Sequence, residues 1–194
     1  MEFAKKYFDD LKDALDKIDQ DKVQAVADVL YNAYKNNQQL FVLGNGGSAS
    51  TASHFACDLN KGTLERFYDR GEKRFRTISL TDNVATMTAF GNDLSYDDIF
   101  AQQLHNLVNR NDVVVAISGS GNSRNVIKAV NLAKELEART IGLLGFDGGI
   151  LKEMVDYSII VPSNHYGIIE DIHMSLTHML SCYLAEKKKQ RCEP

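Results

Sequence analysis

Short strand-like segments alternate with helical stretches over most of the chain, and this alternation limits the possible folds more than any other feature. The strand-like segments are LFVLG (40–44), RTISL (76–80), VVVAIS (113–118), TIGLLG (140–145) and YSIIVP (157–162). Helical stretches are expected near 48–60, 82–90, 97–108, 122–137, 148–155 and 168–187. Strands that alternate with helices require right-handed crossovers and a parallel sheet covered on both faces. The sequence therefore predicts an α/β fold with a five-stranded parallel sheet.

The first 37 residues carry helical periodicity instead. Apolar residues recur at three- and four-residue spacing from Phe3 to Ile18, and again from Val23 to Tyr34. We expect this helical pair to pack on the sheet layer or on another subunit. The chain has 194 residues and shows no linker or low-complexity tract. A single domain over 1–194 is therefore expected, with the helical pair in 1–37 and the α/β core in 38–194.

Composition excludes several classes of protein. No apolar run approaches the ~20 residues that cross a bilayer, and the start MEFAKKYFDDLKDAL is too acidic for a signal peptide, so a cytoplasmic location is expected. Cys57, Cys182 and Cys192 do not suggest a disulfide framework or a thiolate zinc cluster. A net charge of −4 argues against a general nucleic-acid binder. The run EKKKQR at 186–191 is interpreted as a solvated helix end, where lysines suit the helix dipole.

Two turns repeat one pattern of strand, small polar residues and helix: LFVLGNGGSAS (40–50) and VVVAISGSGNS (113–123). In a parallel sheet both turns lie at the carboxyl ends of the strands, where ligands bind in open α/β folds. The first turn formally matches the dinucleotide fingerprint G-x-G-x-x-A. That fingerprint also requires an acidic residue after a second strand, and residues 63–74 are charged and loop-like. A smaller polar ligand close to the GNGG backbone fits better.

The second turn has the composition of an anion-binding nest. Ser118, Ser120 and Ser123 supply hydroxyls, while Gly119 and Gly121 allow backbone N–H groups to converge at the start of a helix. A neutral nest of this kind suits a phosphate monoester, although the same residues also form ordinary turns and helix caps. The turn lacks the lysine of a P-loop, which disfavours binding of ATP or GTP by that device.

Histidines and carboxylates occur on two of the expected helices. His54 and Asp58 share one helical face, with the spacing of a metal-ligand pair, an acid–base pair or an ordinary exposed contact. The segment NHYGIIEDIHMSLTHMLSCYL (164–184) embeds further titratable groups in an apolar helix, where burial would demand partners: Glu170, Asp171, His173 and His178. Periodicity does not show whether the two helices face each other.

Together these motifs resemble the sugar isomerase (SIS) fold and, within it, the phosphoheptose isomerases. The resemblance covers nearly the whole chain and rests on GNGGSAS, HFACDL, AFGNDLSYDDIF, ISGSGNSRNVIKA, LLGFDGG and EDIHMSLTHML in order. It implies a three-layer fold and the conversion of sedoheptulose 7-phosphate to D-glycero-D-manno-heptose 7-phosphate. It also implies a homotetramer with the active site between subunits, and neither nucleic acid nor membrane as a partner.

The resemblance also implies roles for individual residues. The phosphate is expected in the nest of Ser118, Gly119, Ser120 and Ser123. The sugar is expected to contact Asn45, Gly46, Gly47, Asn92 and Asp93, together with Asp58 and Glu170. One zinc ion per subunit would be held by His54, Asp58, Glu170 and His178. Asp58 and His178 would also act as the acid–base groups.

Proton transfer between neighbouring carbons needs a base, a shuttle to oxygen and stabilisation of the enediolate, which a carboxylate, a histidine and a metal would supply. The reaction is redox neutral, so no redox cofactor is expected. The chain departs from the family pattern at three positions. Asp58 and Glu170 stand where glutamate and glutamine are usual. Gly62 stands near a position where the family often has an arginine, and Lys61 or Arg66 could take over the role of that arginine.

Two alternatives stay open. One is a non-catalytic SIS scaffold resembling the DnaA initiator-associating protein, and the other is an isomerase of a different phosphosugar. Retention of His54, Asp58 and His178 favours an enzyme, because a scaffold has no need of a convergent metal set. A phosphosugar-sensing regulator would need a fused DNA-binding domain, for which 194 residues leave no room.

Overall fold

A computed structural model describes residues 1–190. Its five strands are β1 (Gln39–Gly44), β2 (Arg76–Ser79), β3 (Val113–Ser118), β4 (Arg139–Gly145) and β5 (Tyr157–Val161). They pair in parallel in the order β2-β1-β3-β4-β5, which confirms the predicted α/β fold. The winding direction changes between β1 and β3, so the two glycine- and serine-rich turns leave the sheet side by side at its switch point.

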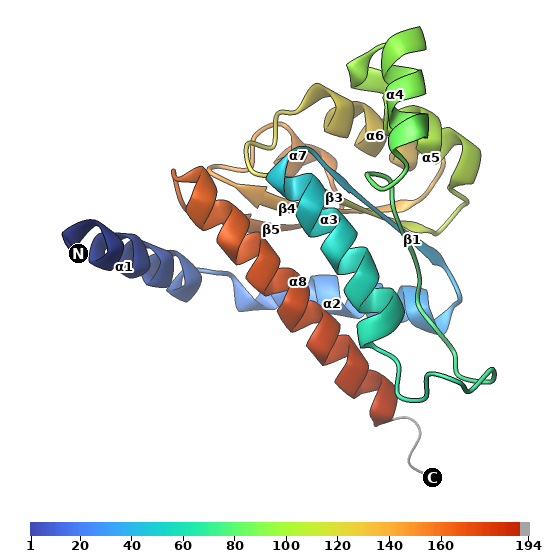
Figure 1. Ribbon diagram of the computed structural model, residues 1–194, viewed down its shortest axis with the longest axis horizontal. Coiled ribbons are helices and arrows are strands. Elements are labelled where there is room, and N and C mark those ends of the chain that lie inside the picture. The colour runs from blue at the N-terminus through green and yellow to red at the C-terminus, as the bar shows by residue number, and fades with distance from the viewer. Residues whose placement is uncertain (191–194) are drawn as a thin grey trace.

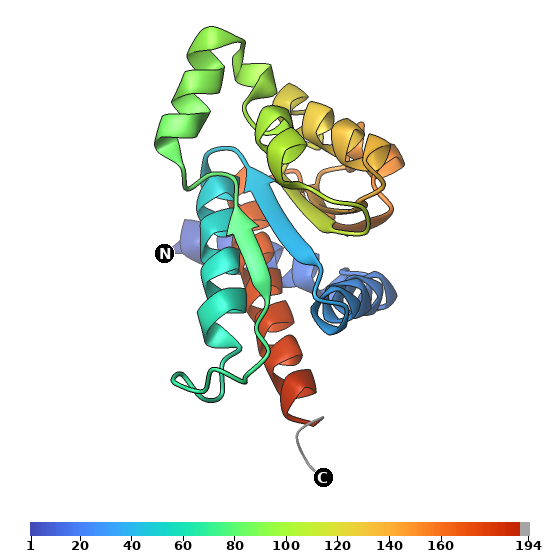
Figure 2. The same cartoon turned by 90° about the vertical axis from the view of Figure 1, so that its right-hand side faces the viewer.

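Helices cover both faces of the sheet (Figures 1 and 2). One face is covered by α2 (Gln20–Lys35), α3 (Gly47–Cys57) and α8 (Tyr166–Lys189). The other face is covered by α5 (Ala101–Leu107), α6 (Arg124–Glu135) and α7 (Leu151–Met154). The remaining helices are α1 (Glu2–Asp16), the π turn η1 (Asp58–Gly62), α4 (Val84–Asp93) and the 3-10 turn η2 (Tyr96–Asp98).

The central strands are apolar on both sides because each side meets a helical layer. In β1, Leu40 and Val42 join the core beneath α3 and α8, while Phe41 and Leu43 join the core beneath α6. All four are 0% exposed. This alternation follows from the two-residue period of a strand, in which successive side chains point to opposite faces of the sheet.

The N-terminal helical pair is present as predicted. Asp19 caps α2 by accepting hydrogen bonds from the backbone N–H groups of Asp21 and Lys22. In contrast, α1 extends away from the body of the domain (Figure 1), and Phe3 and Phe8 are 79% and 65% exposed. The pair therefore packs on the sheet layer through α2 and leaves much apolar surface of α1 uncovered.

The end of α8 differs from the prediction of a solvated helix end. Lys188 is 4% exposed and makes hydrogen bonds within the domain, so the prediction was wrong for this residue. Arg191, the last residue of that run, and Cys192 lie outside the described residues. None of the helices in residues 1–190 has the length and apolar content of a bilayer-spanning segment.

Candidate active site

The two polar turns meet over a small cavity. Gly44 of β1 lies beside Ile117 of β3, so that Asn45 stands next to the second turn. Asn45 and Asn125 exchange two side-chain hydrogen bonds of 2.9 and 2.8 Å, and Tyr96 donates a third bond to Asn45 Oδ1 at 3.0 Å. The cavity has a volume of about 160 Å³ and is lined by Asn45, Ser48, Ile117, Ser118, Gly119, Ser120, Ser123, Tyr166 and Glu170.

The four residues of the predicted nest all line this cavity. Ser123 is the N-cap residue of α6, yet its side chain makes no capping hydrogen bond within the described chain. The positive end of the α6 dipole is therefore available to an anion. Ser118 and Ser120 accept backbone N–H bonds from Gly121 and Asn122, so their hydroxyls also stabilise the turn. The turn-forming role and the lining of a polar cavity coexist here.

Glu170 reaches the cavity from α8 because residue 47 is a glycine. A Cβ atom at Gly47 would lie 2.5 Å from Glu170 Oε2. The carboxylate therefore rests against the first turn of α3, where a helix dipole favours negative charge. This position is beside the nest, and Glu170 does not belong to the histidine–aspartate cluster described next. Its role as a zinc ligand stays a prediction.

His54, Asp58 and His178 form a close cluster at the contact between α3 and α8. The Nε2 atoms of His54 and His178 lie 2.8 Å apart. Asp58 Oδ2 lies 3.4 Å from His54 Nε2 and 3.8 Å from His178 Nε2. All three side chains keep contact with solvent, with exposed fractions of 47%, 27% and 52% in the order His54, Asp58, His178. Packing of α8 along α3 thus joins residues 124 positions apart.

The donor set of the cluster suits a divalent metal. Its three possible ligand atoms all lie within 4.8 Å of one another. Two unprotonated imidazole nitrogens at 2.8 Å would point lone pairs at each other, so the pair needs a shared proton or a cation between them. Two imidazoles and a carboxylate are ligands that zinc prefers. Three of the four residues of the zinc site that the resemblance implies therefore fit a zinc ion, whereas Glu170 lies outside this cluster.

Asp58 stands at a change in helix type that its spacing did not reveal. It opens the π turn η1 directly after α3 ends at Cys57. The turn closes at Thr63, whose hydroxyl donates a 2.7 Å hydrogen bond to the carbonyl of Leu59. Single π turns are rare and frequently occur at functional sites.

Three other predicted residues, Gly46, Asn92 and Asp93, are not among those that line the cavity or form the cluster. Asn92 and Asp93 are exposed on the last turn of α4, where Asn92 Nδ2 donates to Asp93 Oδ1 at 2.9 Å. Gly46 has φ +56° as the N-cap residue of α3, and a Cβ there would meet open space. The sugar contacts of these three residues stay predictions.

Asp171 and His173, the other two titratable groups singled out on α8, have structural partners. Asp171 Oδ2 accepts a 2.7 Å hydrogen bond from the hydroxyl of Tyr7 on α1. His173 is 0% exposed, and its Nε2 lies 3.0 Å from the carbonyl oxygen of Leu144. Burial lowers the pKa of His173 to about 4, although the contact with the Leu144 carbonyl opposes this shift. These two residues therefore secure α8 on its neighbours.

Five residues of the site escaped sequence reasoning: Ser48, Tyr96, Ile117, Asn125 and Tyr166. The first four belong to the motifs GNGGSAS, AFGNDLSYDDIF and ISGSGNSRNVIKA, so each was within a recognised segment. Tyr166 lies against Gly119, where a Cβ would come within 3.1 Å of its ring. No local pattern marked Tyr166, because this contact joins the start of α8 to a turn far away in the chain.

A five-stranded parallel α/β domain with glycine- and serine-rich turns at its switch point has the architecture of a SIS domain. Residues 6–145 match the SIS domain family. The chain is 43% identical over 168 residues to the phosphoheptose isomerase of Geotalea daltonii, an alignment that covers 86% of this chain and 84% of that relative.

Solved structures agree with this assignment. Phosphoheptose isomerase GmhA from Neisseria gonorrhoeae has a TM-score of 0.87 at 30% identity, covering 95% of this chain and 98% of that one. A phosphoheptose isomerase from Francisella tularensis has a TM-score of 0.86 at 29% identity, covering 95% and 97%. The chain therefore belongs to the phosphoheptose isomerases, a family of enzymes.

Proposed function

We propose that this chain interconverts sedoheptulose 7-phosphate and D-glycero-D-manno-heptose 7-phosphate in the cytoplasm. The observation that carries the proposal is the contact of His178 on α8 with His54 and Asp58. The same two helices, α3 and α8, also contribute Ser48, Tyr166 and Glu170 to the lining of the nest cavity. Gly47 and His54 are seven residues apart on α3, which corresponds to ~10 Å along the helix axis. An extended seven-carbon phosphate spans a similar length, so its ester and its carbonyl end could engage both places at once.

In this mechanism the nest binds the phosphate and the cluster moves the protons. The hydroxyls of Ser120 and Ser123 and the N-terminus of α6 would hold the phosphate without a positively charged side chain. Asp58 would take a proton from the carbon beside the carbonyl and return it to the neighbouring carbon. His178 would carry the proton that leaves one oxygen and enters the other, so the reaction balances without an oxidant.

A zinc ion would be held by His54, Asp58 and His178. Glu170 is the proposed fourth ligand and would have to leave its place against Gly47 to join them. When bound, the zinc ion would supply positive charge next to the developing negative oxygen. Asp58 and Glu170 are proposed to contact the sugar as well as the metal.

The proposal is tested by assaying the purified, zinc-supplemented protein for formation of the aldose from sedoheptulose 7-phosphate. Asp58→Asn and His178→Ala are expected to lower kcat by ~100-fold or more, since each removes a proton-transfer group. Binding of the phosphosugar should largely persist in both variants. Absence of turnover at every zinc concentration tested would refute the assignment. Turnover of another phosphosugar alone would show that the enzyme has a different substrate.

The phosphate position is tested separately in the Asp58→Asn background, where the bound sugar is not consumed. Ser120→Ala should weaken binding of sedoheptulose 7-phosphate by ~10-fold or more, because a hydrogen bond to a charged group is lost. Binding of unphosphorylated sedoheptulose should hardly change. Ser175→Ala, on the exposed side of α8, is the matched control. If Ser120→Ala weakens the binding of both sugars equally, the phosphate does not bind in the nest.

A further inference from the structure

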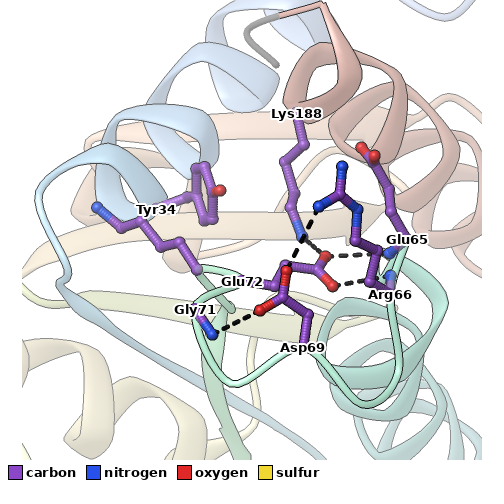
Figure 3. Close-up of a pocket in the computed structure, with 8 residues that line it drawn as sticks. Tyr34, Glu65, Arg66, Asp69, Gly71, Glu72 and Lys188 are labelled. Carbon is purple, nitrogen blue, oxygen red and sulfur yellow. Dashed lines mark hydrogen bonds and ion pairs between the residues drawn. The ribbon is translucent and has the colours of Figure 1, made fainter.

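A buried lysine joins the two elements that carry the histidine–aspartate cluster. Lys188 lies in the last turn of α8, ten residues after His178, and is 4% exposed. Its Nζ donates hydrogen bonds to the carbonyl of Thr63 at 2.7 Å and to Glu72 Oε1 at 3.1 Å. It also lies 5.4 Å from the centroid of the Tyr34 ring. Figure 3 shows Lys188 pointing from α8 toward Glu72.

The contact with Thr63 reaches the π turn itself. Thr63 is the C-cap residue of η1 and is 1% exposed. Its backbone carbonyl binds the ammonium, while its hydroxyl binds back to Leu59 within the turn. The end of the turn that Asp58 opens is therefore attached to α8 by a charge-assisted hydrogen bond, which is stronger than a neutral one.

Glu72 extends the attachment to the segment that follows the turn. Its two carboxylate oxygens accept hydrogen bonds from the backbone N–H groups of Glu65 and Arg66, at 3.0 and 2.9 Å. Burial raises the pKa of Glu72, but these two bonds and Lys188 together hold it below its ordinary value. The carboxylate is therefore charged at neutral pH and neutralises the buried ammonium. A cavity of about 310 Å³ beside the pair is lined by Tyr34, Glu65, Arg66, Asp69, Gly71, Glu72, Lys73 and Lys188 (Figure 3).

These contacts attach the end of α3–η1 to α8, beyond the cluster. Both elements start at the same edge of the sheet and run alongside each other (Figure 1). They meet at Gly47 and Glu170, then at the cluster, and again at Thr63 and Lys188, ~15 Å beyond His178 along α8. Of the three residues in the cluster, only Asp58 has its backbone on the π turn. An uncommon backbone conformation persists where the surrounding structure holds it.

We propose that Lys188 is a positioning residue for the reaction. By fixing the end of η1 against α8, it holds the Asp58 carboxylate at its distance from the two imidazoles. The inference rests on the proposed function, because it concerns the affinity and geometry of the cluster toward a divalent metal. A lysine that only stabilised the fold would affect unfolding without changing how the cluster binds metal.

The experiment titrates the metal-free protein with Co²⁺, whose visible absorption reports the ligand geometry. Lys188→Met removes the ammonium and keeps an apolar side chain, and it should weaken Co²⁺ binding ~10-fold or more and alter the visible bands. Lys189→Met is the matched control, since Lys189 is exposed on the same turn, and it should behave like the wild type. Glu72→Gln keeps the Thr63 contact, so its Co²⁺ spectrum should stay that of the wild type even if it unfolds at a lower temperature.

Each outcome bears on the proposal. If Lys188→Met does not fold, Lys188→Gln, a neutral side chain one atom shorter, is measured in its place with the same expectation. A variant at 188 that binds Co²⁺ with unchanged affinity and spectrum would overturn the positioning role and leave the proposed function standing. A spectral change of equal size in Glu72→Gln would also overturn it, because the effect would not come from Thr63. Failure of the wild type to bind Co²⁺ would overturn both proposals.

Discussion

At the scale of single residues, glycine decides how closely the groups of the site approach. At Gly47, the Glu170 carboxylate occupies the space that a Cβ would take. At Gly121, the backbone of Gly148 occupies that space, and its carbonyl oxygen would lie 1.9 Å from a Cβ. The first neighbour is the end of a flexible side chain and the second is main chain. The two positions should therefore respond differently to the same added methyl group.

Gly47→Ala is expected to fold with a melting temperature within ~2 °C of the wild type, because Glu170 can rotate away. Its kcat/KM should fall ~10-fold or more, since the carboxylate leaves the cavity. Gly121→Ala should instead lose ~2 kcal/mol or more of unfolding free energy, because φ is +63° and the contact is with backbone. Thermal unfolding and steady-state kinetics measure both variants. Full activity in Gly47→Ala would show that Glu170 does not act at this position.

His173 is expected to make stability depend on pH in a defined window. Its pKa is lowered to about 4 from 6.5, so the unfolded chain binds the proton more readily. Its stabilising contribution is therefore complete above pH 6.5 and is lost as the pH falls toward 4. Between pH 7 and pH 5 the unfolding free energy should drop by about 2 kcal/mol through this group. Urea unfolding of the wild type and of His173→Leu at both pH values isolates the effect, and parallel losses in the two proteins would contradict it.

At the scale of elements, the strands were predictable and the contacts between helices were not. The central strands β1, β3 and β4 are short, largely apolar runs buried on both sides, and the observed bounds of β1 and β3 differ from the expected ones by at most one residue. Burial on both faces leaves a signal within the segment itself. The rules of parallel sheets place both turns at the carboxyl ends of the strands, whereas the pairing of β1 with β3 that brings them side by side was not predicted.

The contact of α8 with α3 leaves no such local signal. Periodicity tells which face of α8 is apolar, but His178 lies 124 residues from His54 and finds it only through tertiary packing. The π turn escaped prediction for a related reason, since its stability depends on groups outside it, such as Lys188. The three lysines at the end of α8 look alike in sequence, and only their positions in the fold separate the buried one from the others.

At the scale of the whole molecule, α1 presents apolar surface that a single chain does not cover. Phe3, Phe8 and Leu15 are 79%, 65% and 40% exposed. A groove of about 220 Å³ lies between α8 and the junction of α1 with α2, and is lined by Leu15, Ile18, Gln20, Val23, Ser175, Leu176 and Met179. Exposed apolar residues gathered on one projecting helix are typical of an interface. We therefore extend the proposed function to a homotetramer in which α1 contributes to the contacts between subunits.

Charge placed on this helix should break the assembly without unfolding the domain. Phe3→Asp combined with Phe8→Asp is expected to shift the mass measured by light scattering from four chains toward one or two. Burial of an uncompensated carboxylate at an apolar interface is unfavourable, whereas the same group costs little in water. Lys5→Asp, on the exposed part of the same helix, controls for the change in charge. If the active site is completed between subunits, turnover should fall together with the mass while circular dichroism stays unchanged. If the variant dissociates and keeps full turnover, one chain carries the whole site. The cluster on α3 and α8 would then act without residues from another subunit.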